Sequence, residues 1–176
     1  MIDMINPAVL VMGVCGSGKS SVAARLAEQI GATYLEADDY HPKENISAMS
    51  QGIPLTDEMR QPWLDALGDS LAEERVNGPV VLACSALKLS YRDTLRRRGG
   101  PFEIVYLTAP HSVISERLAN RRGHYMRPGL LDSQLADLEP PGADESPVIL
   151  DIQSPVDQIA RNAADEIRRR HLQRVT

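Results

Sequence analysis

The chain has little cysteine and few aromatic residues. Of its 176 residues, two are cysteines, Cys15 and Cys84, and 4% are aromatic. Two thiols cannot supply the disulfide framework of a small secreted domain, and both follow apolar runs, so we expect buried, reduced thiols. With so few aromatic side chains, Val, Ile, Leu and Ala must fill most of the core.

A long apolar run and an excess of positive charge are also missing. No stretch approaches the roughly 18 apolar residues of a membrane span. The first residues do not show the basic and then apolar segments of a signal peptide. The net charge of −5 argues against a nucleic-acid surface. We therefore expect a cytoplasmic protein with neither a membrane nor a nucleic acid as partner.

Apolar runs alternate with helical patterns along the chain. Runs typical of buried parallel strands cover residues 8–12, 33–35, 80–84, 103–107 and 148–152. Patterns typical of amphipathic helices cover residues 20–30, 60–77, 90–98, 112–121 and 156–172. This alternation predicts a three-layer α/β fold with a mostly parallel five-stranded sheet and helices on both faces.

Two segments interrupt the alternation. Residues 41–56 and 122–142 are rich in Pro, Gly and charged side chains, as loops over ligands often are. We expect one domain over residues 1–176, with a lid at about 122–142 and an acceptor-binding excursion at about 41–78.

A glycine-rich turn joins the first strand to the first helix. It reads Gly13, Val14, Cys15, Gly16, Ser17, Gly18, Lys19, Ser20, which is the complete phosphate-loop pattern, and Ser21 follows. The glycines let backbone N–H groups approach phosphates, Lys19 adds a point charge, and the Ser20 hydroxyl suits Mg²⁺. The pattern and its flanks predict a P-loop NTPase fold that binds ATP along this turn.

Acidic residues follow the second apolar run. Glu36 and Asp38 lie on one face if the strand continues that far, and carboxyl ends of parallel strands border the ligand crevice. We interpret Asp38 as the base that accepts a hydroxyl proton and Glu36 as a residue that helps to hold Mg²⁺. A solvated acidic loop is the alternative. His41 is either a donor to a polyhydroxylated substrate or a core histidine.

The third run ends in small and basic residues. Ser85 leaves room for a ligand against the backbone, and Lys88 and Arg92 share one face if the stretch is helical. Together the two cations could bind a carboxylate, although an exposed basic helix face is equally consistent with the pattern.

Arginines gather at the start of the second interruption. They are Arg117, Arg121, Arg122 and Arg127, and Gly123 and Gly129 provide hinges. Arginines that close over a transferring phosphoryl group stabilise its charge, so we expect a lid here, although any single arginine could instead belong to a solvated helix surface.

Taken together, these motifs resemble gluconate kinases of the short P-loop type, which are related in fold to shikimate kinase and the nucleoside monophosphate kinases. Beyond the phosphate loop, the resemblance rests on Asp38-x-x-His41-Pro-x-x-Asn45, Gly52-x-Pro-Leu-x-Asp57-x-x-Arg60-x-Pro-Trp63, Cys84-Ser-Ala-Leu-Lys88-x-x-Tyr91-Arg92, Arg117-Leu, Arg121-x-Gly-His124 and residues 139–145.

The resemblance implies transfer of the γ-phosphate of ATP to the 6-hydroxyl of gluconate, with Mg²⁺, by a homodimer. It implies an acceptor site made by Asp38, His41, Asn45, Arg60, Ser85, Lys88, Arg92 and His124. It also implies that Arg117 and Arg121 lie near the nucleotide and Arg127 near its phosphates. By similarity to the lids of related kinases, Arg127 is expected to be a catalytic residue.

Two alternatives remain open. A shikimate kinase-like enzyme is the first, although its third strand usually ends in glycines where this chain has Ser85, Ala86 and Leu87. A nucleotide-binding regulator without a transfer reaction is the second, although it would need neither an acceptor pocket nor a base.

Overall fold

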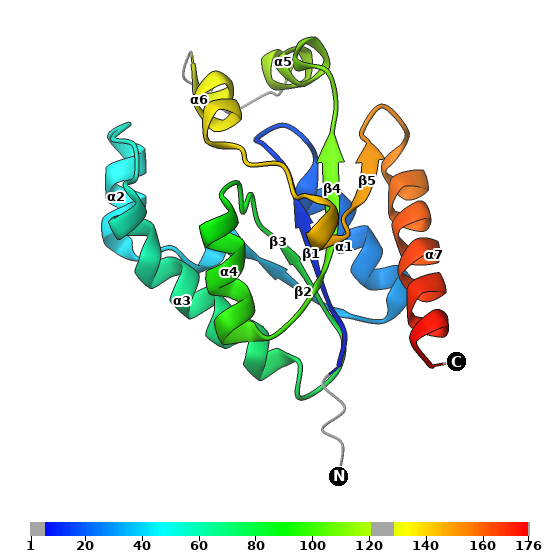
Figure 1. Cartoon of the computed structure of the whole chain (residues 1–176). Coiled ribbons are helices and arrows are strands. Elements are labelled where there is room, and N and C mark those ends of the chain that lie inside the picture. The colour runs from blue at the N-terminus through cyan, green and yellow to red at the C-terminus, as the bar shows by residue number, and fades with distance from the viewer. Residues whose placement is uncertain (1–5, 121–128, 176) are drawn as a thin grey trace.

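A five-stranded parallel sheet forms the centre of the molecule (Figure 1). The computed structural model describes residues 6–120 and 129–175. The sheet has the order β2-β3-β1-β4-β5, and every neighbouring pair of strands is parallel. The strands are β1 (Ala8–Met12), β2 (Thr33–Glu36), β3 (Val80–Ala83), β4 (Glu103–Thr108) and β5 (Val148–Asp151).

Helices α1 (Lys19–Ile30) and α7 (Val156–Val175) cover one face of this sheet, and α3 (Asp57–Glu74) and α4 (Leu89–Gly99) cover the other. The other helices are α2 (Lys43–Ser50), α5 (His111–Ala119) and α6 (Leu130–Asp137), with short 3₁₀ turns η1 (Ala37–Tyr40) and η2 (Ala143–Glu145). The arrangement confirms the predicted three-layer α/β fold. In the part of the chain described, no helix is long and apolar enough to span a membrane.

Alternate residues of the inner strands β1, β3 and β4 build two cores. Val9 and Val11 of β1 pack with α1 and α7 on one face. Leu10 and Met12 pack with α3 and α4 on the other face. Because both faces are covered, all five residues of β1 are buried, which is why the strand reads as a continuous apolar run.

Several predicted helices and strands begin or end at other residues than expected. Helix α3 begins at Asp57 instead of residue 60, because the Thr56 hydroxyl accepts a hydrogen bond from the Met59 N–H at 3.2 Å and caps the helix. Strand β2 stops at Glu36, and Asp38 lies in η1 instead of a continuing strand. Helix α5 ends at Ala119.

The two interruptions of the alternation contain helices of their own. Figure 1 shows α2 at the edge of the molecule beside the start of α3, and α5 and α6 beyond the carboxyl ends of the strands. The described parts of both interruptions therefore lie toward the same end of the sheet.

Candidate active site

The phosphate loop lies between β1 and α1 with its glycines in conformations that other residues rarely adopt. Gly18 has a φ of 86° and directly precedes α1. A Cβ at Gly13 would lie 2.8 Å from the Leu107 carbonyl oxygen, so a side chain there would collide with β4. The loop therefore requires glycine at both positions, and its N–H groups stand at the N-terminus of a twelve-residue helix.

Lys19 is held inside this loop. Its Nζ donates a hydrogen bond to the Val14 carbonyl at 3.0 Å. Burial lowers the pKa of Lys19, while the nearby Asp38 and Glu36 carboxylates act in the opposite direction. The ammonium group thus lies in a partly desolvated site with carboxylates around it, where an anionic ligand would interact with it more strongly than in water.

The end of β2 brings an acidic group to the first turn of α1. Glu36 Oε2 accepts hydrogen bonds from the Ser20 hydroxyl at 2.6 Å and from the Tyr34 hydroxyl at 2.5 Å. Burial and the adjacent Glu36 raise the pKa of Tyr34, so it stays a donor. Hydroxyl and carboxylate oxygens are ligands that Mg²⁺ prefers, so this pair fits the metal.

No group of three or more His, Cys, Asp or Glu side chains converges as a metal site within residues 6–120 and 129–175. Mg²⁺ in kinases is usually bound by one or two side chains together with the phosphates of the nucleotide.

A cleft of about 450 Å³ joins these groups. It is lined by Cys15, Gly16, Gly18, Lys19, Ser20, Ser21, Glu36, Asp38, Cys84, Ser85, Arg117, Leu118 and Gln134. The structure therefore brings together Lys19, Glu36 and Asp38 with Ser85 from the end of β3. Val14 and Ser17 lie outside the lining and are buried.

A second polar cluster, which we call the α3/α4 cluster, lies where these two helices begin. It consists of Asp57, Arg60, Lys88 and Tyr91. Lys88 Nζ lies 3.0 Å from both Asp57 carboxylate oxygens, and Arg60 donates to the Tyr91 hydroxyl at 2.9 Å. The Tyr91 hydroxyl in turn donates to Asp57. Hydrogen bonds from Tyr91 and Lys88 lower the pKa of Asp57, so the cluster holds an ionised carboxylate between two cations.

His41 interacts with groups of both the cleft and the α3/α4 cluster. Burial lowers its pKa, the charge of Asp38 acts to raise it, and the charge of Arg60 acts to lower it. Its ring stacks on Trp63 with centroids 4.3 Å apart. The Trp63 indole donates to the Ala37 carbonyl at 2.7 Å, which fixes η1 and with it the position of Asp38.

Two predicted acceptor residues are occupied within the protein. Asn45 is 3% exposed, and its amide donates to the Met59 carbonyl at 3.0 Å, which joins α2 to α3. Arg92 is 1% exposed and outside the cleft lining. Its guanidinium binds Glu145 at 2.8 Å and the Ala86 carbonyl at 2.9 Å.

The expectation that Lys88 and Arg92 form one open cationic face is therefore wrong. Lys88 precedes α4, and the Arg92 side chain points into the protein instead of toward solvent.

The cleft wall formed by α5 and α6 includes Arg117 and Gln134. Arg117 donates to the Ile152 carbonyl. Gln134, on α6, accepts a hydrogen bond at 2.6 Å from the Cys15 N–H of the phosphate loop. Arg121, His124 and Arg127 lie outside the described residues, so their predicted roles remain predictions.

Comparison with known proteins found a matching family model and several similar proteins. The model of the AAA domain family matches residues 9–139. The thermoresistant gluconokinase of Escherichia coli K12 is 41% identical over 162 residues, covering 91% of this chain and 93% of the relative. The gluconokinase of Gluconobacter oxydans is 47% identical over 142 residues, covering 80% and 79%. The chain belongs to the gluconokinase family.

Solved structures agree with this family. A gluconokinase from Sinorhizobium meliloti superposes with a TM-score of 0.84 at 46% identity, covering 94% of this chain and 93% of that one. A shikimate kinase from Aquifex aeolicus reaches a TM-score of 0.65 at 15% identity, which shows a shared fold alone.

Sequence analysis missed several groups that complete the site of this gluconokinase family member. Trp63 and Asp57 stand in the motifs that carry the resemblance, yet neither was assigned a place in the site. Gln134 gave no signal, because its partner is 119 residues away in the chain. Glu145 looked like one acid among many, although its side chain is only 6% exposed.

Proposed function

We propose that this protein catalyses the ATP-dependent phosphorylation of D-gluconate at its 6-hydroxyl, giving 6-phospho-D-gluconate and ADP. The observation that carries the proposal is that Lys19 and Asp38 line one cleft between the phosphate loop and the ends of β2 and β3. The names of the relatives support gluconate as the acceptor.

The phosphoryl transfer follows from this arrangement. N–H groups of the phosphate loop and Lys19 hold the β- and γ-phosphates. The 6-hydroxyl oxygen attacks the γ-phosphorus while Asp38 accepts the hydroxyl proton. The new O–P bond forms as the bond from the γ-phosphorus to the β,γ-bridging oxygen breaks, and ADP leaves with that electron pair. Ser20 and Glu36 would hold Mg²⁺, which supplies positive charge to the phosphate oxygens.

The α3/α4 cluster suits the other end of the acceptor. Gluconate carries its carboxylate and its 6-hydroxyl at opposite ends of the carbon chain, so a site for it needs separate groups for each. Arg60 and Lys88 contribute two positive charges and Asp57 one negative charge, which leaves one net positive charge for a carboxylate. His41, which interacts electrostatically with both Asp38 and Arg60, is suited to meet the hydroxyls in the middle.

The remaining assignments are extensions of the same proposal. Arg117 and Arg121 would contact the nucleotide, and Arg127 the transferring phosphoryl group, with His124 near the acceptor. The homodimer rests on the family resemblance, and the cytoplasmic location rests on the low cysteine content.

An acceptor panel tests the proposed function. The purified protein with Mg·ATP should release ADP in a coupled assay when gluconate is added, and not with shikimate or AMP. A reaction without acceptor measures background ATP hydrolysis. Equal rates with every acceptor and with none would reject the proposal, and preference for shikimate would favour the shikimate kinase-like alternative. Nucleotide binding without ADP release would favour the regulator.

A further inference from the structure

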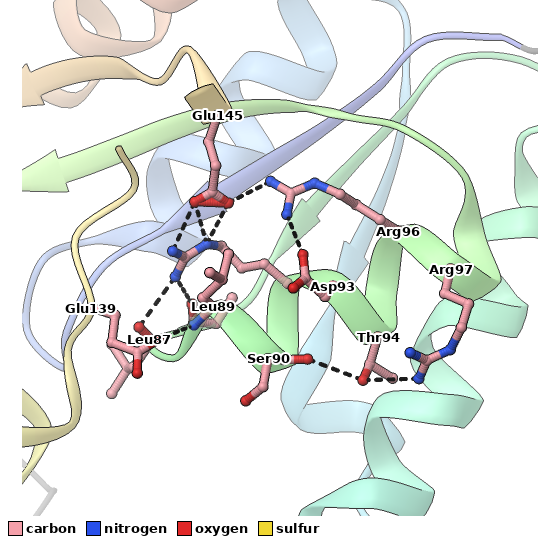
Figure 2. A network of polar contacts seen from close by, with 11 residues as sticks. Leu87, Leu89, Ser90, Asp93, Thr94, Arg96, Arg97, Glu139 and Glu145 are labelled. Carbon is pink, nitrogen blue, oxygen red and sulfur yellow. Dashed lines mark hydrogen bonds and ion pairs between the residues drawn. The ribbon is translucent and has the colours of Figure 1, made fainter. Parts of the chain in front are cut away.

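A buried charge network links the end of the lid segment to the loop after β3 (Figure 2). Arg92 and Glu145 form its centre, with Arg92 Nε 2.9 Å from both carboxylate oxygens and Nη2 2.8 Å from Oε2. Their side chains are 1% and 6% exposed. Arg96 adds a further contact to Glu145 Oε1 at 2.5 Å. This nearly buried carboxylate is therefore bound by the buried guanidinium of Arg92 and by the partly exposed guanidinium of Arg96.

The same arginine holds the backbone of the loop that carries Ser85 and Lys88. Arg92 Nη1 donates to the carbonyls of Ala86 at 2.9 Å and Leu87 at 3.2 Å. Ala86 has a φ of 44°, which is uncommon for a residue with a side chain. Such a conformation persists where its surroundings fix it, and two hydrogen bonds from a buried arginine provide that restraint.

Glu139 holds this loop from the other side. Its N–H donates to the Leu87 carbonyl at 2.9 Å. Its carboxylate accepts from the N–H of Leu89, the first residue of α4, where negative charge is favourable. Figure 2 shows the Glu139 side chain directed at the start of α4 and the Glu145 carboxylate directed at arginine side chains of the same helix.

The segment that supplies both carboxylates also touches the nucleotide side. Gln134 contacts the phosphate loop, and five residues later Glu139 contacts the loop after β3. The chain between α6 and β5 thus bridges the two halves of the cleft.

We propose that Arg92, Glu139 and Glu145 are positioning residues that set the loop 84–88 for the acceptor. Arg92, placed by resemblance among the acceptor ligands, acts through Ser85 and Lys88 instead of touching the sugar acid. The expected effect on kinetics rests on the proposed function. The expected effect on the structure of the loop rests on the contacts alone.

The structural consequence is tested without substrate. Amide hydrogen exchange of residues 84–92 should be faster in Glu139→Gln and Glu145→Gln than in the wild type. Asp69→Asn is the matched control, because it removes an ion pair of 2.7 Å to Arg98 on the same helix α4, at the exposed surface. Unchanged exchange in both glutamine variants, or equal acceleration in the control, would overturn the inference.

The kinetic consequence separates positioning from folding. The Glu139 side chain is exposed. In Glu139→Gln the KM for gluconate should rise about tenfold, because a small displacement of a binding group weakens its interaction by a large factor. The KM for ATP should stay unchanged. Arg92→Lys should also raise the KM for gluconate and leave the KM for ATP unchanged, because lysine keeps the charge but cannot form the several hydrogen bonds of the guanidinium group. Equal changes in both KM values, or none in either variant, would overturn it.

Failure of the proposed function gives a different result. A wild-type protein that does not phosphorylate gluconate would reject that function, while the exchange comparison would still decide whether these three residues hold the loop.

Discussion

The Ser20 hydroxyl donates a hydrogen bond to Glu36 Oε2 across 2.6 Å, from the first turn of α1 to the end of β2. It brings two oxygen groups suited to Mg²⁺ to the edge of the cleft beside Lys19. The bond also sets the distance between the phosphate loop and β2. The strand in turn leads into η1 and Asp38, so β2 connects the nucleotide side of the cleft to the acceptor side.

Removing the Lys19 ammonium should nearly abolish turnover. In Lys19→Ala we expect kcat to fall at least about a hundredfold, because a preorganised positive charge next to the phosphates is lost. The measurement is the coupled ADP assay with gluconate. Lys43→Ala is the matched control, because Lys43 is exposed at the start of α2 and should leave kcat unchanged. Equal loss in both variants would contradict the role of Lys19.

Asp38→Asn should remove the proton acceptor and keep the fold. We expect kcat to fall by a factor of about 10² or more, with the KM for ATP unchanged, because an amide cannot take the hydroxyl proton. Asp39→Asn, one residue further along η1, should behave as the wild type. A wild-type rate in Asp38→Asn would remove Asp38 from the base role.

Lys88→Met should weaken the acceptor and spare the nucleotide. Loss of the charge leaves Arg60 and Asp57 to cancel each other, so the cluster can no longer attract a carboxylate. The KM for gluconate should rise roughly tenfold to a hundredfold, as expected for a charged hydrogen bond. Titration of ATP in the same assay provides the control, and a parallel rise in its KM would contradict the assignment.

The stability contribution of Glu145 should depend on pH. Burial alone would raise the pKa of this carboxyl, but hydrogen bonds from Arg92 and Arg96 outweigh it and hold the pKa below the usual 4.5. The pair therefore stabilises the fold fully above pH 4.5, and this stabilisation is lost as pH falls through the folded pKa.

Urea unfolding of the wild type and Glu145→Gln measures this effect. At neutral pH the variant should be less stable by about 1 to 3 kcal/mol, because it leaves the buried Arg92 guanidinium without its countercharge. The difference should shrink at values progressively below 4.5, where the wild-type carboxyl becomes protonated. A difference that does not change with pH would contradict the ionised pair.

Cys84 should resist thiol reagents in the native protein. It is 2% exposed, and burial raises its pKa to about 12, so the thiolate that reacts is scarce at neutral pH. In Cys15→Ser, which leaves Cys84 as the one cysteine of the chain, a disulfide reagent should react only after denaturant is added. Rapid labelling of the native variant would contradict the burial.

Local patterns predicted the fold and the phosphate loop well. The apolar runs located every strand, because covered strands of a parallel sheet contain few polar residues. The glycines and Lys19 were found because their spacing is dictated by backbone contact with phosphate.

The predictions that were wrong concern residues whose contacts are distant in the sequence. Charge spacing on α4 suggested an open basic face, whereas Arg92 turns inward to Glu145, 53 residues further along the chain. Asp38 lies on a 3₁₀ turn instead of a strand, because Trp63 of α3 binds the Ala37 carbonyl from 26 residues away. Neither contact leaves a periodic trace in the sequence, so only the folded chain could show them.

The central claim is that one cleft holds the terminal phosphate of ATP within reach of a hydroxyl of gluconate at the ends of β2 and β3. A crystal structure of the protein with a non-hydrolysable ATP analogue, Mg²⁺ and gluconate tests it directly. The account predicts the γ-phosphate beside Lys19, the 6-hydroxyl at Asp38 and the carboxylate at Lys88. Gluconate bound away from Asp38, or turned with its carboxylate toward the γ-phosphate, would contradict it.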